Sequence, residues 1–320
     1  MRILVVSPID REALGELRRQ HDVVVALDAG EHALDQIVRD REAIVFRSGV
    51  NLSQDILSSA PDLRLLIRAG SGFDNVDLDH LRRQGIEFIR IPEPGAKAVA
   101  EMAFALMLAL ARNLLVADRL LRQGHWAKHQ LTGYGLQGKV LGIVGAGNIG
   151  IRVGQLGAAW GMEVLGCVER PSPAIAARLS EHGIRLTGLD EVLAASDFVS
   201  VHVPLQPSTR HLLDAARLAR MKPGAFLVNL SRGGVVDEEA LRRELTTEGR
   251  LRGAALDVHA REGEGQVSIL ADLPNVILTP HVGASTIDAQ REIGQRIVKI
   301  VSEHAARMAV PAAVPAMQPV

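Results

Sequence analysis

Residues 136–150 read Leu-Gln-Gly-Lys-Val-Leu-Gly-Ile-Val-Gly-Ala-Gly-Asn-Ile-Gly. The apolar, β-branched run from Lys139 to Val144 is typical of a buried strand. Gly145, Gly147 and Gly150 follow it in Gly-x-Gly-x-x-Gly spacing, in which the first glycine permits a tight turn, the second leaves room for a pyrophosphate and the third allows close helix packing. This stretch predicts a strand, a phosphate-binding turn, and a helix whose first N–H groups face the anion.

The residues after the turn favour this interpretation over a plain structural turn, which also uses glycine. Val153, Leu156 and Trp160 share one face of the helix that is expected next. A second strand is expected at Glu163 to Val168, as in a strand–helix–strand unit. The context therefore indicates a dinucleotide site.

The composition excludes several classes of protein. The chain has 320 residues, of which 47% are hydrophobic, and this is enough for two domains with sizeable cores. A formal net charge of -1, with no basic block, gives no field that attracts nucleic acid. The single cysteine, Cys167, fits a reducing compartment. Met1 to Pro8 lacks the pattern of a signal peptide, and charged residues interrupt the most apolar helix, Ala98 to Leu115, so we expect a cytoplasmic protein without a membrane span.

Strand-like and helical runs alternate along the chain, which predicts an α/β fold with parallel strands and right-handed crossovers. We expect two doubly wound parallel-sheet domains, a flavodoxin-like substrate domain and a Rossmann-type dinucleotide-binding domain. The expected strands are Ile3–Val6, Val23–Ala26, Ala43–Phe46, Leu65–Ile67 and Glu87–Ile89 in the first domain, then Lys139–Val144, Glu163–Val168, Phe198–Val203, Ala225–Leu230, Gly253–Val258 and Val276–Leu278 in the second.

Pro92, Pro94 and Gly95 are expected to end the first run of strands. The last helix, about Ile287 to Arg307, is long enough to return to the first domain. The predicted domains are therefore residues 1–97 with 287–320, and residues 98–286. The Pro- and Ala-rich segment Val310 to Val320 is expected to be a frayed tail.

Three polar signals follow neighbouring strands of the second domain: Arg232, then Asp257 with Glu262, then His281. Open α/β sheets bind ligands at the carboxyl ends of their strands, so we expect these residues to converge. The guanidinium of Arg232 can hold a carboxylate through two hydrogen bonds. His281 can protonate a forming alkoxide, and Glu262 can bond to the imidazole. Taken singly, each residue is more often structural or a surface group. The combination predicts an oxyacid site.

The sequence resembles the D-isomer-specific 2-hydroxyacid dehydrogenase family from about Val45 to Lys299. The Gly145 loop, His202-Val203-Pro204-Leu205, residues 229–237 (Asn-Leu-Ser-Arg-Gly-Gly-Val-Val-Asp) and residues 280–286 (Pro-His-Val-Gly-Ala-Ser-Thr) carry the resemblance. Residues 68–77, Arg-Ala-Gly-Ser-Gly-Phe-Asp-Asn-Val-Asp, are similar to the substrate loop of the D-3-phosphoglycerate dehydrogenase branch.

The resemblance implies an enzyme that transfers a hydride between NAD(P)(H) and a 2-oxo acid/D-2-hydroxy acid pair without a metal. It implies Arg232 as the substrate anchor, His281 as the acid/base and Glu262 as its partner, although Gly263 stands where the family usually has proline. It also implies that Asp257 holds the nicotinamide amide. The implied cofactor contacts are Gly145, Gly147, Asn148, Ile149, Gly150, Glu169, Arg170, His202, Pro204, Thr209, Leu230, Ser231, Asp257 and Gly283.

The leading substrate is 3-phosphohydroxypyruvate or a close anionic analogue. The resemblance implies that the Ser71–Gly72 backbone binds the substrate carboxylate. Arg47, Ser48 and Arg68 lie at expected strand ends, where their charge or hydrogen bonds favour a second anion, although each is equally typical of a surface or ion-paired residue. Three alternatives remain open: a glyoxylate or hydroxypyruvate reductase, a reductase of a phosphonate or sulfonate 2-oxo acid, and an NAD(H)-sensing scaffold that binds other proteins.

Two further expectations concern the cofactor and the assembly. Val168 stands where the family's acidic ribose-binding residue is expected, and Glu169 and Arg170 follow it. Glu169 favours NAD(H), whereas Arg170 favours NADP(H), and we expect NAD(H) because the glutamate is closer to the strand end.

The resemblance implies a homodimer in which the helix from Ala98 and residues 112–126 pack across a two-fold axis. The alternative is that these residues are buried within the monomer.

Overall fold

The computed structural model describes residues 1–27, 29–47, 49–72, 76–248 and 250–309. The chain divides into two compact units. Unit 1 comprises Met1–Pro94 and the chain from Thr286 onward, and unit 2 comprises Gly95–Ser285. The tail expected after Val310 lies outside the described residues.

Unit 1 is a five-stranded parallel sheet with helices on both faces. Its strand order, β2-β1-β3-β4-β5, is the flavodoxin-like order. The elements are β1 (Arg2–Val5), α1 (Arg11–Gln20), β2 (Asp22–Val25), α2 (Glu31–Ile37), a 3-10 helix (Val38–Asp40), β3 (Ala43–Phe46), α3 (Gln54–Ser58), β4 (Leu65–Arg68), α4 (Leu78–Gln84), β5 (Glu87–Arg90) and α12 (Ile287–Ala309).

Alternate residues of the unit 1 strands fill two cores. Ile3 and Val5 of β1 pack with residues of α1 and α12, such as Leu17 and Ile297. Leu4, on the opposite face, packs with residues of α2, α3 and α4. A strand that is buried on both faces needs apolar residues at every position, which explains the unbroken apolar runs in the sequence.

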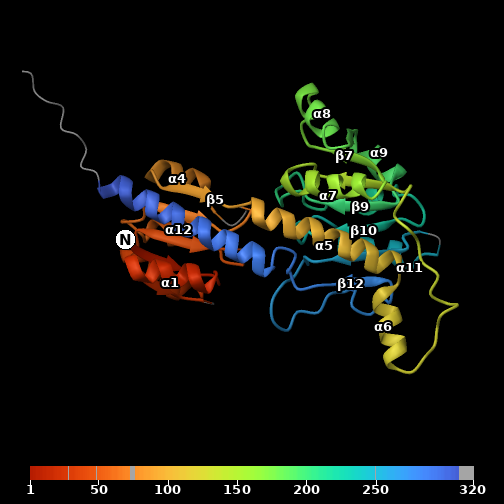
Figure 1. Ribbon diagram of the computed structural model, residues 1–320, viewed down its shortest axis with the longest axis horizontal. Helices are drawn as coiled ribbons and strands as arrows, with labels where there is room; N and C mark the ends of the chain where they lie inside the picture. Colours follow the sequence, from red (N-terminus) through yellow and green to blue (C-terminus); the bar gives the residue numbers. More distant parts are fainter. Residues whose placement is uncertain (28, 48, 73–75, 249, 310–320) are drawn as a thin grey trace, which may run out of the picture. The chain divides into compact units, whose positions relative to one another are not determined.

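Unit 2 is a seven-stranded parallel sheet with the order β12-β11-β10-β9-β6-β7-β8, the Rossmann order with one added strand. Helices α5 and α7 share one core with the sheet, and α9, α10 and α11 share the other. Figure 1 labels α5, α7, α9 and α11 beside the strands of this sheet. The elements are α5 (Glu93–Ala111), α6 (Leu114–Arg122), β6 (Val140–Val144), α7 (Asn148–Ala159), β7 (Glu163–Cys167), α8 (Pro173–Ser180), β8 (Ile184–Leu186), α9 (Leu189–Ala195), β9 (Phe198–Val201), α10 (Ala215–Leu218), β10 (Phe226–Asn229), α11 (Glu238–Thr246), β11 (Gly253–Leu256) and β12 (Val276–Leu278).

The expected fold class is confirmed, with two corrections. The sequence predicts six strands in the second sheet, but the structure adds β8, whose three residues have the polar Arg185 at the centre and lie at the sheet edge. The apolar helix begins at Glu93 because Pro94 is compatible with a first helical turn. It ends at Ala111, before Asn113, whose φ of 52° interrupts the helix.

Helix α5 is the one described helix that is long and apolar enough to cross a membrane. Within its apolar window, 67% is buried inside the protein. Its residues Ala103 and Met107 are fully buried in the core that covers β6. A long apolar helix with this degree of burial has the character of a core helix.

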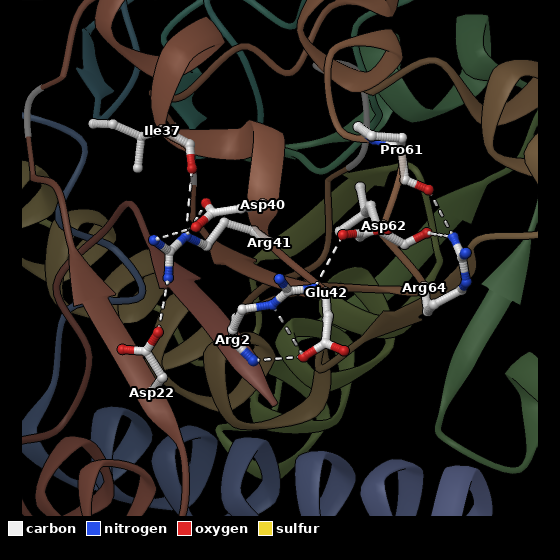
Figure 2. A network of polar contacts seen from close by, with 10 residues as sticks. Arg2, Asp22, Ile37, Asp40, Arg41, Glu42, Pro61, Asp62 and Arg64 are labelled. Atoms are coloured by element: carbon white, nitrogen blue, oxygen red, sulfur yellow. Dashed lines mark hydrogen bonds and ion pairs between the residues drawn. The ribbon is translucent and has the colours of Figure 1, made fainter.

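Ion pairs link the segments that precede the strands of unit 1 (Figure 2). Arg2 contacts Asp62 at 3.0 Å, and its backbone N–H donates to Glu42 at 2.7 Å. Arg41 pairs with Asp40 at 3.0 Å and with Asp22 at 3.5 Å. These charges lie at the amino ends of the strands, and therefore at the edge opposite the carboxyl ends where such sheets bind ligands.

Candidate active site

The glycine turn of unit 2 forms an open anion cradle. Gly147 is the N-cap of α7 and has no side-chain capping bond, so the first N–H groups of the helix are left for a ligand. A Cβ added at Gly147 would meet no atom within 4 Å, whereas one at Gly150 would lie 2.3 Å from the carbonyl of Gly145. Gly145 itself has a φ of 97°. These three positions fit the pyrophosphate of a dinucleotide.

The segment after β9 packs against this turn. A Cβ at Gly145 would lie 2.7 Å from the carbonyl oxygen of His202. Burial lowers the pKa of the His202 imidazole to about 3, so the ring is neutral, and its Nε2 lies 2.8 Å from Ser200 Oγ. The hydroxyl of the buried Thr209 donates to the carbonyl of Pro204 at 2.6 Å, which closes the loop.

The end of β7 places Glu169 and Arg170 at the surface. The hydroxyl of Ser208 donates to Glu169 Oε1 at 3.3 Å, which holds the carboxylate toward the loop after β9. Asn148 is exposed and Ile149 is half-buried in the first turn of α7. The predicted cofactor residues of β6, β7 and β9 thus lie around one glycine turn.

His281 and Glu262 form a hydrogen-bonded pair. His281 Nδ1 lies 2.9 Å from Glu262 Oε2. The other carboxylate oxygen, Oε1, accepts the backbone N–H of His259 at 3.1 Å. Burial raises the pKa of Glu262, but the bond and charge of His281 together with the His259 N–H outweigh this and hold it below its usual range. Glu262 is therefore ionised at neutral pH.

Asp257 fixes the loop that carries His281. This carboxylate is buried and accepts three bonds, from the Thr279 hydroxyl at 2.6 Å and from the N–H groups of Val282 and Gly283 at 2.9 and 2.7 Å. His281, between these anchors, has a φ of 54°, which is uncommon for a residue with a side chain. The loop thus holds His281 in a strained backbone conformation, a common feature of functional sites.

Arg232 lies in a turn that the Asn229 side chain organises. Asn229 Oδ1 accepts the Ser231 N–H at 3.0 Å, and its amide donates to the Arg232 carbonyl at 3.2 Å. Arg232 is half-buried, and its guanidinium donates to the Ser231 carbonyl at 2.7 Å. Leu230 and Ser231 are buried below it. Because β10, β11 and β12 are adjacent and parallel, Arg232, Glu262 and His281 follow three neighbouring strand ends.

A cavity of about 470 Å³ adjoins the histidine–glutamate pair. Both His281 and Glu262 contribute to its lining, and Thr279 and Pro280 line it from the end of β12. The pair is therefore accessible to small molecules and is not sealed in the core.

On unit 1, the predicted substrate residues gather at the carboxyl ends of β3 and β4. Arg68 is only 4% exposed, with its guanidinium 5.3 Å from the centre of the Phe46 ring, and its Nε donates to the Gly72 carbonyl at 2.8 Å. Arg90 donates to the Ser71 carbonyl at 3.3 Å. These bonds support the predicted carboxylate-binding loop. Ser48 lies outside the described residues.

Arg47 is half-buried at the end of β3, beside the strand-order switch point between β1 and β3. Its backbone N–H donates to Ser7 Oγ at 2.9 Å. Burial lowers the pKa of the guanidinium, and no partner for that group is found among the described residues. A partly desolvated cation without a counter-ion is costly, so this position is suited to an anionic ligand.

Two residues of the site were not predicted from the sequence. His259 contacts Glu262 and the His281 loop, and Arg90 supports the Ser71–Gly72 loop. His259 stands two residues after Asp257, so its proximity to the predicted cluster is the signal that could have identified it.

Comparison with known proteins settles the family. The model for the NAD binding domain of D-isomer specific 2-hydroxyacid dehydrogenases matches residues 104–283. The chain belongs to this family. The expected resemblance is thus confirmed, and NAD is confirmed as the class of cofactor.

The family's curated and solved members include enzymes of different names. The chain is 36% identical over 305 residues to a D-3-phosphoglycerate dehydrogenase of Methanocaldococcus jannaschii, covering 95% of this chain but only 57% of that protein. It is 37% identical to a hydroxypyruvate reductase of Thermotoga maritima, covering 93% of this chain and 96% of that protein. The crystal structure of a D-lactate dehydrogenase from Aquifex aeolicus, complexed with NAD and lactic acid, has a TM-score of 0.84 and 29% identity, covering 95% of this chain and 96% of that chain.

Proposed function

We propose that this protein is an NAD(H)-dependent D-2-hydroxyacid dehydrogenase whose substrate carries a second anion besides its carboxylate. The 2.9 Å bond between His281 and Glu262, on the strand ends next to Arg232 and in the same unit as the glycine turn, supports this activity most directly. Unit 2 is then the dinucleotide-binding domain and unit 1 the substrate domain. A reducing, cytoplasmic location fits the single cysteine, Cys167.

In the reduction direction, the turn of Gly145, Gly147 and Gly150 would hold NADH, which would provide a hydride for the carbonyl carbon of the 2-oxo acid. His281 protonates the carbonyl oxygen, and Glu262 stabilises the imidazole in the orientation that this transfer needs. Arg232 holds the substrate carboxylate and stabilises the charge that develops on the oxygen. In oxidation, His281 takes the proton back from the hydroxyl group.

The leading substrate is 3-phosphohydroxypyruvate or a close anionic analogue, because Arg47 offers a half-buried cation that has no counter-ion among the residues that the structure describes. Hydroxypyruvate is the second candidate, since the reductase of Thermotoga maritima matches over nearly its whole length. Phosphonate and sulfonate 2-oxo acids share the required charge and belong in the same test.

We expect kcat/KM for 3-phosphohydroxypyruvate to exceed that for pyruvate by at least about tenfold, since a charged hydrogen bond contributes about 1.5–3 kcal/mol. A panel of 2-oxo acids with and without a distal phosphate, phosphonate or sulfonate measures this. Arg47→Met should remove the preference and leave pyruvate reduction unchanged. Arg82→Met, which alters an exposed arginine of α4, is the matched control. Equal efficiency of the wild type on both acids would refute the proposal of a second anion.

We expect NADH to be preferred over NADPH by about tenfold or more, which corresponds to about 1.4 kcal/mol. Ser208 orients the Glu169 carboxylate, which accepts ribose hydroxyls and repels a 2'-phosphate in this proposal. Values of kcat/KM for both cofactors should converge in Glu169→Ala and change little in Arg170→Ala. A preference for NADPH that disappears in Arg170→Ala is the contrary result.

We propose a homodimer formed through an apolar surface on α6 and the segment after it. Leu114, Leu115, Leu121 and Trp126 are 52%, 52%, 58% and 80% exposed, and α6 has no buried residue. An exposed apolar patch of this kind is typical of a protein–protein interface, and in this proposal a second copy of the chain buries it across a two-fold axis.

Light scattering at micromolar concentration should therefore give the mass of a dimer. Leu121→Asp should shift the protein toward the monomer, because it places a charge in the apolar interface. Leu27→Asp, at an exposed leucine of unit 1, is the control and should remain dimeric. A wild-type protein with the mass of a monomer contradicts the proposal.

A further inference from the structure

His259 contacts all three chain segments that carry the proposed catalytic groups. We propose that His259 is a positioning residue that fixes the loops of Glu262, His281 and Arg232 relative to one another. This inference rests on the proposed function. His259 lies in the loop after β11, two residues beyond the buried Asp257. It makes three separate contacts, through its ring, its backbone N–H and its carbonyl.

The ring ties this loop to the His281 loop. His259 Nε2 lies 2.9 Å from the carbonyl oxygen of Thr279. Since a carbonyl oxygen only accepts hydrogen bonds, Nε2 carries the proton and donates. The same carbonyl accepts the backbone N–H of His281 at 3.0 Å. The ring of His259 therefore fixes the peptide group that precedes the turn into the strained His281.

The second ring nitrogen of His259, Nδ1, makes the histidine less favourable at this position than a purely apolar ring would be. Nδ1 of His259 is buried and has no hydrogen-bond partner within the part of the chain that the structure describes. A phenylalanine would fill the same space without an unpaired buried nitrogen, which has a cost in stability. The Nε2 bond to Thr279 offsets part of this cost, and a phenylalanine cannot make that bond.

The backbone N–H orients Glu262. It donates to Oε1 at 3.1 Å, while Oε2 faces His281 Nδ1 at 2.9 Å. The loop that follows offers no comparable support, because Gly263 and Gly265 have positive φ angles and open space around them. His259 therefore supplies an anchor for the carboxylate that the glycine-rich loop does not supply.

The carbonyl of His259 supports the Arg232 turn. A Cβ added at Gly233 would lie 1.8 Å from this oxygen, so only glycine permits such an approach. A shift of the His259 backbone would therefore displace Arg232 as well as Glu262. His259 also lines the cavity beside His281 and Glu262, but its Nε2 proton is donated to the Thr279 carbonyl and its Nδ1 is buried. We therefore assign it a role through its neighbours and not in proton exchange with the substrate.

The test compares His259→Phe, which keeps the ring but loses the donor, with His259→Gln, whose amide nitrogen can donate to the Thr279 carbonyl. His259→Phe should lower kcat about 10- to 100-fold at unchanged NADH affinity, because small displacements of reacting groups have effects of this size. Its pH profile of kcat should also change. His259→Gln should recover most of kcat and the wild-type profile.

A second readout is independent of activity. The Nδ1–H proton of His281, hydrogen-bonded to Glu262, should give a downfield NMR resonance in the wild type that weakens in His259→Phe and returns in His259→Gln. An unchanged resonance together with unchanged kcat in His259→Phe would overturn the positioning role, as would a Gln variant no better than Phe. Full activity of His281→Ala would instead overturn the proposed function, whatever the NMR result.

Discussion

Replacement of His281 by alanine is expected to lower kcat by about 10²–10⁴-fold, the usual contribution of a positioned general acid or base. The reason is geometric as well as chemical. His281 bonds to Glu262 at 2.9 Å, and Asp257 binds the two N–H groups that follow it in the chain. Without the imidazole, the Glu262 carboxylate loses the proton donor that it holds at this position. Steady-state kinetics at saturating NADH measure the loss.

Two controls separate chemistry from folding. His281→Asn retains a residue that tolerates the left-handed backbone conformation at φ 54°, so its loss of kcat should match that of alanine without loss of stability. His32→Ala, at an exposed histidine of α2, should leave kcat unchanged. NADH affinity, measured by fluorescence, should be preserved in all three variants. Near wild-type turnover in His281→Ala would show that the residue is structural.

Replacement of Arg232 by alanine is expected to lower kcat/KM for the 2-oxo acid by about 10²–10⁴-fold, since two charge-assisted bonds contribute about 1.5–3 kcal/mol each. Most of this loss should appear as a higher KM, because the guanidinium binds the carboxylate of the bound substrate and not only that of the transition state. Arg232→Lys should recover only part of it, because an ammonium group has the charge but not the planar fork.

The Arg232 variants have a close control. Arg220→Ala removes an exposed arginine of the same unit, paired with Asp190 at 2.8 Å, and should change neither kcat nor KM. NADH affinity should be unaffected by Arg232→Ala, because the glycine turn holds the cofactor. An unchanged KM for every 2-oxo acid in Arg232→Ala would exclude Arg232 as the substrate anchor.

The fold could be predicted because buried parallel strands leave a strong pattern in the sequence. Runs such as Ala43 to Phe46 are apolar at every position, since each residue faces one of two cores. β8 left no such pattern, because it is a three-residue edge strand with Arg185 at its centre. The division of the long apolar segment into α5 and α6 depends on one left-handed residue, Asn113, that composition does not reveal.

The candidate site was predictable as far as chain order and strand ends determine it. Arg232, Glu262 and His281 follow adjacent parallel strands, so the topology alone brings them to one edge. The order of the strands does not determine the direction in which a side chain points. Arg68 lies at a strand end as predicted, yet its guanidinium is buried beside Phe46 and bonds to the Gly72 carbonyl. His259 was missed because its role depends on hydrogen bonds between two loops.

The configuration of the product formed with NADH tests the proposed dehydrogenase activity most directly. Purified protein should oxidise NADH only when a 2-oxo acid is present and should yield the D-2-hydroxy acid, with deuterium from 4-deuterated NADH at carbon 2. His281→Ala should form little of this product under the same conditions. Formation of the L acid, or NADH-independent loss of the 2-oxo acid, would contradict the proposed activity.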